Sequence, residues 1–100
     1  MSEWSSVRIA ALNLNKRLGG HAVREQLAEW IDDGGVDVLL AQEPWRKRPH
    51  GSVDVAGLRA VGGNSSVYAW ARPETHAIAE GRETTFAQEV RVGPLKLLNV

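Results

Sequence analysis

Three polar side chains stand where apolar segments of the chain end, and together they could form a metal or phosphate site. Asn13 and Asn15 close the segment that begins at Val7, and Glu43 follows the apolar residues 36–41 after a single glutamine. A carboxylate at the mouth of a buried strand is costly unless something pairs with it. Glu43 is therefore either a metal or substrate ligand or a side chain that has reached solvent, and this stretch alone leaves both interpretations open.

The elements that must position these side chains are two strands and a helix. Residues 36–41 are bounded by Gly34-Gly35 and Pro44, which is typical of a short strand buried on both faces. Val7–Leu14 is a second strand, and its alternation puts Asn13 and Asn15 on the face that carries Val7. Between the two strands, the spacing predicts a helix from about His21 to Asp33.

The predicted helix carries an apolar stripe, and its length decides how the two strands pair. Val23, Leu27, Trp30 and Ile31 follow helical spacing, so all four are expected in the core, and the glycine pair ends the helix. A crossover of this kind makes the strands parallel and the connection right-handed. The two asparagines and Glu43 are then expected at one carboxyl edge, where open α/β sheets bind ligands.

The rest of the chain is expected to be less regular. Residues 57–66 are glycine-rich and predict turns, 67–70 predict a short strand, and the polar residues 72–83 predict no firm structure. Residues 84–92 alternate as a strand, and Gly93-Pro94 should turn it into a hairpin with 95–100. The expected fold class is α/β, a βαβ start followed by antiparallel strands.

Composition excludes several classes of function. Twelve basic and twelve acidic residues give zero net charge, so phosphate recognition must be local rather than a bulk attraction for nucleic acid. The chain has no cysteine, which excludes disulfides and thiolate metal sites. Residues 1–6 form a polar, acidic lead-in, expected to be flexible, without the pattern of a signal peptide. The expected location is cytoplasmic, with no membrane partner, and the sequence leaves the oligomeric state open.

Three motifs resemble the amino-terminal half of the endonuclease/exonuclease/phosphatase family. They are A-L-N-L-N at 11–15, D-V-L-L-A-Q-E at 37–43 and L-K-L-L-N-V at 95–100. In that family a strand ends in Asn-x-Asn or Asn-x-Asp, a helix follows, and the next strand ends in Gln-Glu. The resemblance covers most of residues 7–45 and, more weakly, 84–100. It implies that 7–100 is the amino-terminal part of a metal-dependent phosphodiesterase-like domain, one half of a four-layer α/β sandwich.

The resemblance also implies roles for individual residues. Glu43 is similar to the family's metal-binding carboxylate, Asn13 to the amide that orients the active-site network and the phosphate, and Asn15 to a position near the metal. The expected cofactor is Mg²⁺ or Mn²⁺, because Mg²⁺ keeps most of its waters and needs only one or two carboxylates beside a substrate phosphate. The expected activity is phosphodiester hydrolysis by a nuclease or phosphatase. Nucleic acid, the family's commonest substrate, is favoured over lipid head groups and small phosphoesters.

The sequence also departs from the family. The later Asp-x-Asn and Asp-His motifs are absent from residues 1–100, and the chain stops inside an apolar strand. The chain is therefore expected to be truncated and inactive by itself, with the family's second sheet missing and one sheet face uncovered. The alternative function is a non-catalytic binding or interaction remnant. His21, His50 and His76 are expected to be solvated surface residues rather than general bases.

A basic, aromatic segment follows Glu43 directly. Arg46 and Arg48 could contact substrate phosphates, although the zero net charge favours a solvated loop for Arg46-Lys47-Arg48. Trp45 could stack on a base or sugar, or it could cover the end of the sheet. Trp70 is expected in the core. Asn99 is either a plain strand-end amide or, as its place before Val100 fits the family's pattern, a counterpart of the family's asparagine at this position.

Overall fold

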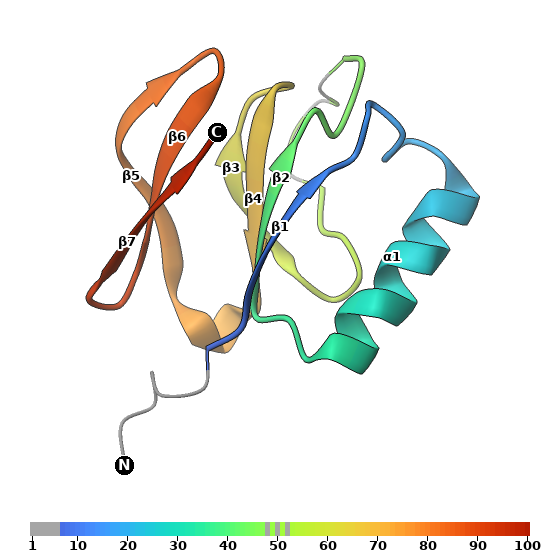
Figure 1. Ribbon diagram of the computed structural model, residues 1–100, viewed down its shortest axis with the longest axis horizontal. Coiled ribbons are helices and arrows are strands. Elements are labelled where there is room, and N and C mark those ends of the chain that lie inside the picture. Colours follow the sequence, from blue (N-terminus) through green and yellow to red (C-terminus); the bar gives the residue numbers. More distant parts are fainter. Residues whose placement is uncertain (1–6, 48, 50, 52) are drawn as a thin grey trace.

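The fold was determined as a computed structural model that describes residues 7–47, 49, 51 and 53–100. Two β-sheets pack face to face, and a helix covers the outer face of the first sheet (Figure 1). In order along the chain, the elements of this described part are β1 (Ile9–Asn13), α1 (His21–Gly34), β2 (Val38–Gln42), β3 (Arg59–Gly63), β4 (Val67–Ala71), the 3-10 helix η2 (Pro73–Thr75), β5 (Ala77–Thr84), β6 (Ala87–Val92) and β7 (Leu95–Asn99). The expected lead-in, residues 1–6, lies outside the described residues.

The first sheet has the strand order β1-β2-β4-β3. β1 and β2 are parallel, as the helical crossover predicted, with Ile9 opposite Val38 and Asn13 opposite Gln42. β4 then pairs antiparallel with β2 and with β3. β2 and β4 are central and almost wholly buried, because one face meets the helix and the other meets the second sheet. The carboxyl ends of β1 and β2 therefore lie at one edge of this sheet.

The helix α1 lies close to the predicted range, and part of its predicted stripe is wrong. Leu27 and Ile31 are buried against the sheet, and Gly35 ends the helix in the left-handed region at φ 61°. Trp30, however, is 48% exposed. The stripe is broader than the contact area, because one short helix on a four-stranded sheet buries only the side chains that point directly at it.

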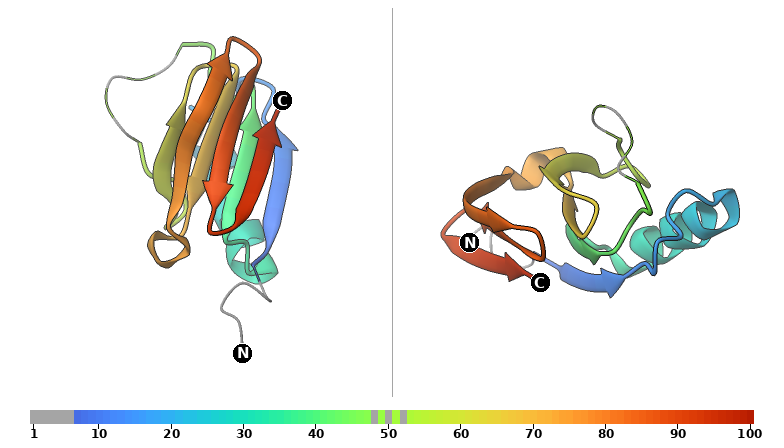
Figure 2. Two further views of the ribbon diagram at one scale, coloured as in Figure 1. Left: turned by 90° about the vertical axis from the view of Figure 1, so that its left-hand side faces the viewer. Right: turned by 90° about the horizontal axis from the view of Figure 1, so that it is seen from above.

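The second sheet has the order β5-β6-β7 and lies against the inner face of the first, with strands running in similar directions (Figure 2, left). Gln88, Val90 and Val92 point inward and are buried, as the alternation predicted. Val90 and Val92 join Val38 and Leu40 of β2 in one apolar cluster between the sheets. The expectation that the second sheet would be missing and one face uncovered is therefore wrong for the inner face of the first sheet.

The expected fold class is also wrong. The described chain is mostly β, and one helix cannot supply the two helical layers of a four-layer α/β sandwich. The misassignment came from two segments that were expected to be turns or unstructured. Residues 57–66 contain β3, whose glycines do not resemble a strand pattern. Residues 72–83 contain most of β5, whose polar residues do not resemble one either.

The glycines of β3 allow close packing against β4 and do not form a turn. Gly62 and Gly63 have φ 137° and 140°, in a region that residues with a side chain seldom adopt, and a bulge separates Ala60 from Gly62. A Cβ at Gly63 would collide with the carbonyl oxygen of Val67 on β4. The close approach of two backbones is therefore what requires glycine here.

No helix within the described residues has the length and apolar character needed to cross a bilayer.

Candidate functional site

The structure brings two of the predicted site residues into direct contact at the carboxyl edge of the first sheet. The Nδ2 of Asn13 donates a hydrogen bond to the Oε2 of Glu43 over 3.0 Å. Thirty positions separate the two residues in the chain. We call this edge the rim and define it by Asn13, Asn15 and Glu43. Asn13 and Asn15 are exposed and Glu43 is half-buried, so a ligand can reach all three.

The backbone of Glu43 explains how its side chain reaches Asn13. Asn13 pairs with Gln42, so in an extended strand Glu43 would point with Leu14 toward the helix side of the sheet. Glu43 instead has φ 48°, in the left-handed region, which breaks the alternation. The carboxylate therefore meets Asn13 only because the chain leaves β2 through a conformation that is unfavourable for a residue with a side chain.

Loops from neighbouring strands hold this conformation in place. The carbonyl oxygen of Glu43 accepts a hydrogen bond from the Lys16 N–H over 2.6 Å, and its own N–H donates to the carbonyl oxygen of Ser66 over 2.8 Å. The Leu18 N–H also donates to the carbonyl oxygen of Pro44. The strained residue is thus fixed from two sides, and left-handed non-glycine residues that are fixed in this way occur often at functional sites.

Asn13 is oriented by its own turn. Its Oδ1 accepts the backbone N–H of Asn15 over 2.8 Å, so the amide group must present Nδ2 to the carboxylate. Asn15 also lies in the left-handed region, at φ 49°. Its side chain makes no hydrogen bond to another described residue. The arrangement suits Asn13 as a donor to carboxylate or phosphate oxygens, and it leaves the amide oxygen of Asn15 open to a cation.

The donors at the rim fit a magnesium-like ion. Only one oxygen of Glu43 is engaged, by Asn13, and within the described residues the other oxygen has no hydrogen-bond partner. One carboxylate and a neutral amide oxygen are hard ligands, sufficient for an ion that keeps several waters. The described residues contain no group of three or more His, Cys, Asp or Glu that could hold a metal.

The three predicted substrate-binding residues differ in burial and in whether the structure describes them. Trp45 is 8% exposed and packs edge-on against Tyr68 and Trp70, with ring centroids 5.0 Å and 5.5 Å away. It therefore covers the end of the sheet, the alternative that the sequence left open, and Trp70 is in the core as expected. Arg46 is exposed. Arg48 lies outside the described residues.

Two basic residues near the rim were not among the predicted site residues. Lys16 and Arg17 follow Asn15 directly, and both are exposed. Because the Lys16 N–H donates to the carbonyl oxygen of Glu43, this second basic pair lies in the loop beside the rim. Two basic loops, one after each parallel strand, therefore flank the carboxylate and could attract an anionic substrate.

The histidines take no part in the rim among the described residues. His21 opens α1 and pairs with Glu25 over 3.0 Å, with both side chains largely exposed. His76 is exposed after η2, and His50 lies outside the described residues. Neither described histidine bonds to Asn13 or Glu43.

Below the rim, amide side chains join the two sheets. Asn99 is 1% exposed. Its Oδ1 accepts from the Nε2 of Gln42 over 2.6 Å, and its Nδ2 donates to the Oε1 of Gln88 over 2.8 Å. The same Nδ2 also lies 3.2 Å from the carbonyl oxygens of Ala41 and Tyr68. We call these three amides, Gln42, Gln88 and Asn99, the amide bridge. Asn99 does end β7, as expected, and its side chain also joins the two sheets.

Comparison of the sequence with models of known protein families and with curated proteins gives no match.

Proposed function

We propose that the rim is a site for divalent-metal-dependent phosphodiester hydrolysis, with Mg²⁺ or Mn²⁺ as the cofactor. The observation that carries the proposal is the contact between Asn13 and Glu43, which unites two of the three motifs on which the resemblance to the endonuclease/exonuclease/phosphatase family rests. The half-buried carboxylate, its unengaged oxygen and the left-handed backbone that presents it add support.

Each rim residue has a distinct role in this proposal. Glu43 would hold the ion through its unengaged oxygen, and Asn15 would complete the protein donors with its amide oxygen. Asn13 fixes the carboxylate and offers an N–H to a phosphate oxygen. When bound, Mg²⁺ supplies stabilisation of negative charge on the phosphoryl oxygens. Exposed Arg46 would attract the substrate backbone.

We favour a nucleic-acid substrate, because basic residues flank the rim on two loops although the chain has no net charge. Phosphate contacts from such loops position a polyanion without selecting its sequence. The predicted cytoplasmic location is part of the same proposal. The chain has no cysteine, so a reducing compartment would not break any disulfide in it.

A second candidate is a module that binds metal and phosphate without turnover. It is favoured by the donor set, because the rim contact among the described residues contains a single carboxylate and no histidine. Hydrolysis also requires groups that position water and stabilise the leaving group. We therefore expect this 100-residue chain to bind at the rim and not to turn over by itself.

The binding test is a titration with MgCl₂ followed by amide NMR shifts. We expect shifts at Asn13, Asn15 and Glu43, and we expect Glu43→Gln to remove them because the neutral amide keeps the shape and loses the charge. Glu29→Gln, on the exposed side of the helix, is the matched control and should leave the shifts unchanged. Shifts that are spread over all surface carboxylates, or that survive in Glu43→Gln, would contradict a metal site at the rim.

The turnover test uses the same three proteins with a chromogenic phosphodiester and with single-stranded DNA. Absence of turnover with intact metal binding supports the binding module for this chain. Magnesium-dependent turnover that is lost in Glu43→Gln and kept in Glu29→Gln would establish hydrolysis and overturn the expectation of inactivity.

A further inference from the structure

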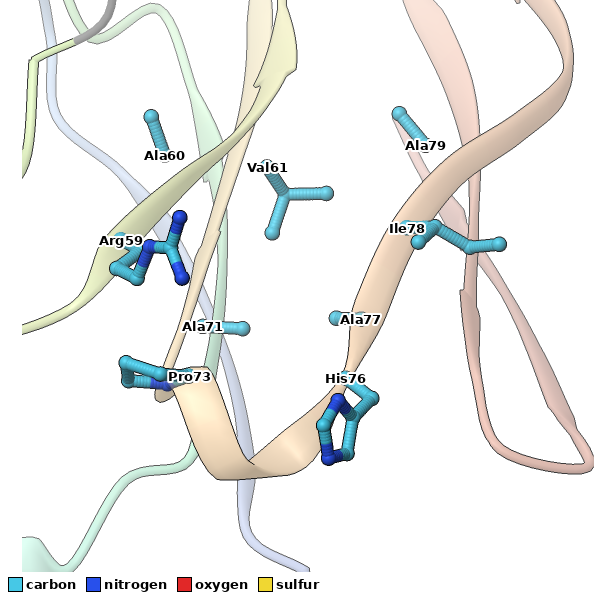
Figure 3. A pocket seen from close by; sticks show the side chains of 9 residues that line it. All are labelled: Arg59, Ala60, Val61, Ala71, Pro73, His76, Ala77, Ile78 and Ala79. Atoms are coloured by element: carbon cyan, nitrogen blue, oxygen red, sulfur yellow. The ribbon is translucent and has the colours of Figure 1, made fainter.

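A cavity lies far from the rim, between the facing edges of the two sheets. It has a volume of about 470 Å³ and opens between β3 and β5. Its wall includes Ala71, which pairs with Val38 at the start of β2, whereas the rim follows the end of β2. Figure 3 shows the cavity between these strands, above the turn formed by η2. The cavity and the rim are thus at opposite ends of the first sheet.

Small apolar side chains create this space. Ala71, Ala77 and Ala79 line the cavity together with Val61, and none of them fills the gap between the strands (Figure 3). Farther along, the sheets close up, since a Cβ at Gly62 would lie only 3.8 Å from the Cβ of Ala79. The strands separate toward η2, because the chain needs that turn to pass from β4 into β5. The result is an open recess whose wall combines small apolar side chains with the polar groups of Arg59 and His76.

The wall of this recess includes a positively charged side chain, that of Arg59. Arg59, the first residue of β3, pairs with Ala71, so its side chain leaves the same face of the sheet as the apolar lining. Figure 3 shows its guanidinium directed toward the space between the strands. Among the described residues it makes no ion pair and no side-chain hydrogen bond. Arg72 and Arg91, by contrast, are paired with Asp37 and Glu80.

We propose that this recess binds a small organic anion whose apolar body lies against the alanines and whose carboxylate meets Arg59. The volume falls within the range of about 300–1,000 Å³ that is usual for small-ligand sites. A guanidinium offers a planar pair of donors that match a carboxylate. The inference does not depend on the function proposed for the rim.

The experiment uses hexanoate as the probe and hexanol as its uncharged match, both added to the whole chain and followed by amide NMR. Hexanoate is expected to shift Arg59, Ala77 and Ala79, and hexanol at the same concentration is expected to shift them much less. Equal or stronger binding of hexanol would overturn the role of the charge. Absence of shifts at these amides with hexanoate would overturn the site.

Two variants and a control sharpen the result. Arg59→Met should weaken hexanoate binding about fivefold, which is the size of a partly exposed ion pair, and Arg24→Met, at an exposed position of α1, should leave it unchanged. Ala79 is exposed, so the fold should tolerate Ala79→Leu. The larger side chain should fill the recess and abolish binding. Equal losses in the two arginine variants, or full binding by Ala79→Leu, would contradict the proposal. A urea unfolding curve for each variant checks that the fold is intact.

Discussion

The rim and the amide bridge use the same kinds of side chain for opposite purposes. They are neighbours, since Gln42 of the bridge precedes Glu43 of the rim and pairs with Asn13. The bridge is buried or nearly so, and no buried side-chain nitrogen or oxygen among the described residues lacks a partner. The rim is accessible and leaves one carboxylate oxygen unengaged. Satisfied polar groups hold a structure together, whereas accessible, partly satisfied groups can bind a ligand.

Strain separates the two regions as well. The bridge residues Gln42, Gln88 and Asn99 lie within regular strands and orient their amides by ordinary alternation. At the rim, Asn15 and Glu43 both have positive φ, and so does Lys16 beside it. The left-handed conformation of Glu43 costs stability and places its carboxylate at the surface. Proteins often keep such a costly conformation where the side chain binds a ligand.

The largest expected effect is on the bridge. Asn99→Ala leaves the Oε1 of Gln88 without a partner and removes one acceptor of Gln42, inside a region closed to water. We expect the free energy of unfolding to fall by about 3 kcal/mol. Asn13→Ala, at the exposed rim, should cost less than about 1 kcal/mol. Urea denaturation of both variants measures the difference, and equal losses would erase the contrast between the two regions.

A smaller effect of opposite sign is expected at the rim. Glu43→Gly relieves the left-handed conformation and keeps the backbone hydrogen bonds, so it should stabilise the fold by up to about 1 kcal/mol. The same variant should lose the magnesium-dependent NMR shifts. Ala56→Gly is the matched control, because Ala56 has φ 55° in a turn away from the rim, and it should stabilise without any loss of metal response. Destabilisation by Glu43→Gly alone would indicate a structural role for the carboxylate.

The smallest effect concerns Glu89, a carboxylate that is bonded but not part of the rim. The backbone N–H of Arg82 lowers the pKa of Glu89, with a further contribution from Lys96. The native state therefore favours the charged form, and this stability is complete above the ordinary glutamate pKa of about 4.3 and is lost as pH falls through the lowered value. Urea curves between neutral and acidic pH should show a slightly weaker acid dependence in Glu89→Gln. An unchanged dependence would mean that the hydrogen bond to Arg82 is not formed in solution.

The local sequence pattern was sufficient to predict an element wherever its apolar residues repeat with a single helical or strand period. The helix, the parallel strands and the β6–β7 hairpin could be predicted because each has an apolar repeat, and all of these elements except β1 have glycine or proline at an end. β3 and β5 could not. β3 is a strand because its backbone fits closely against β4, and β5 is an exposed strand that β6 holds in place by hydrogen bonds. Such strands depend on their neighbours, so their own residues carry little signal.

The candidate site divides in the same way. The sequence by itself determined that two asparagines and a glutamate end parallel strands, because residue type, strand period and crossover length are local properties. Only the tertiary structure decided that Glu43 faces Asn13, because strand alternation alone would have turned it away. Tertiary packing also placed Trp45 and Asn99 inside and Trp30 outside. Burial depends on which surfaces meet, and that is a property of the whole fold rather than of any one segment.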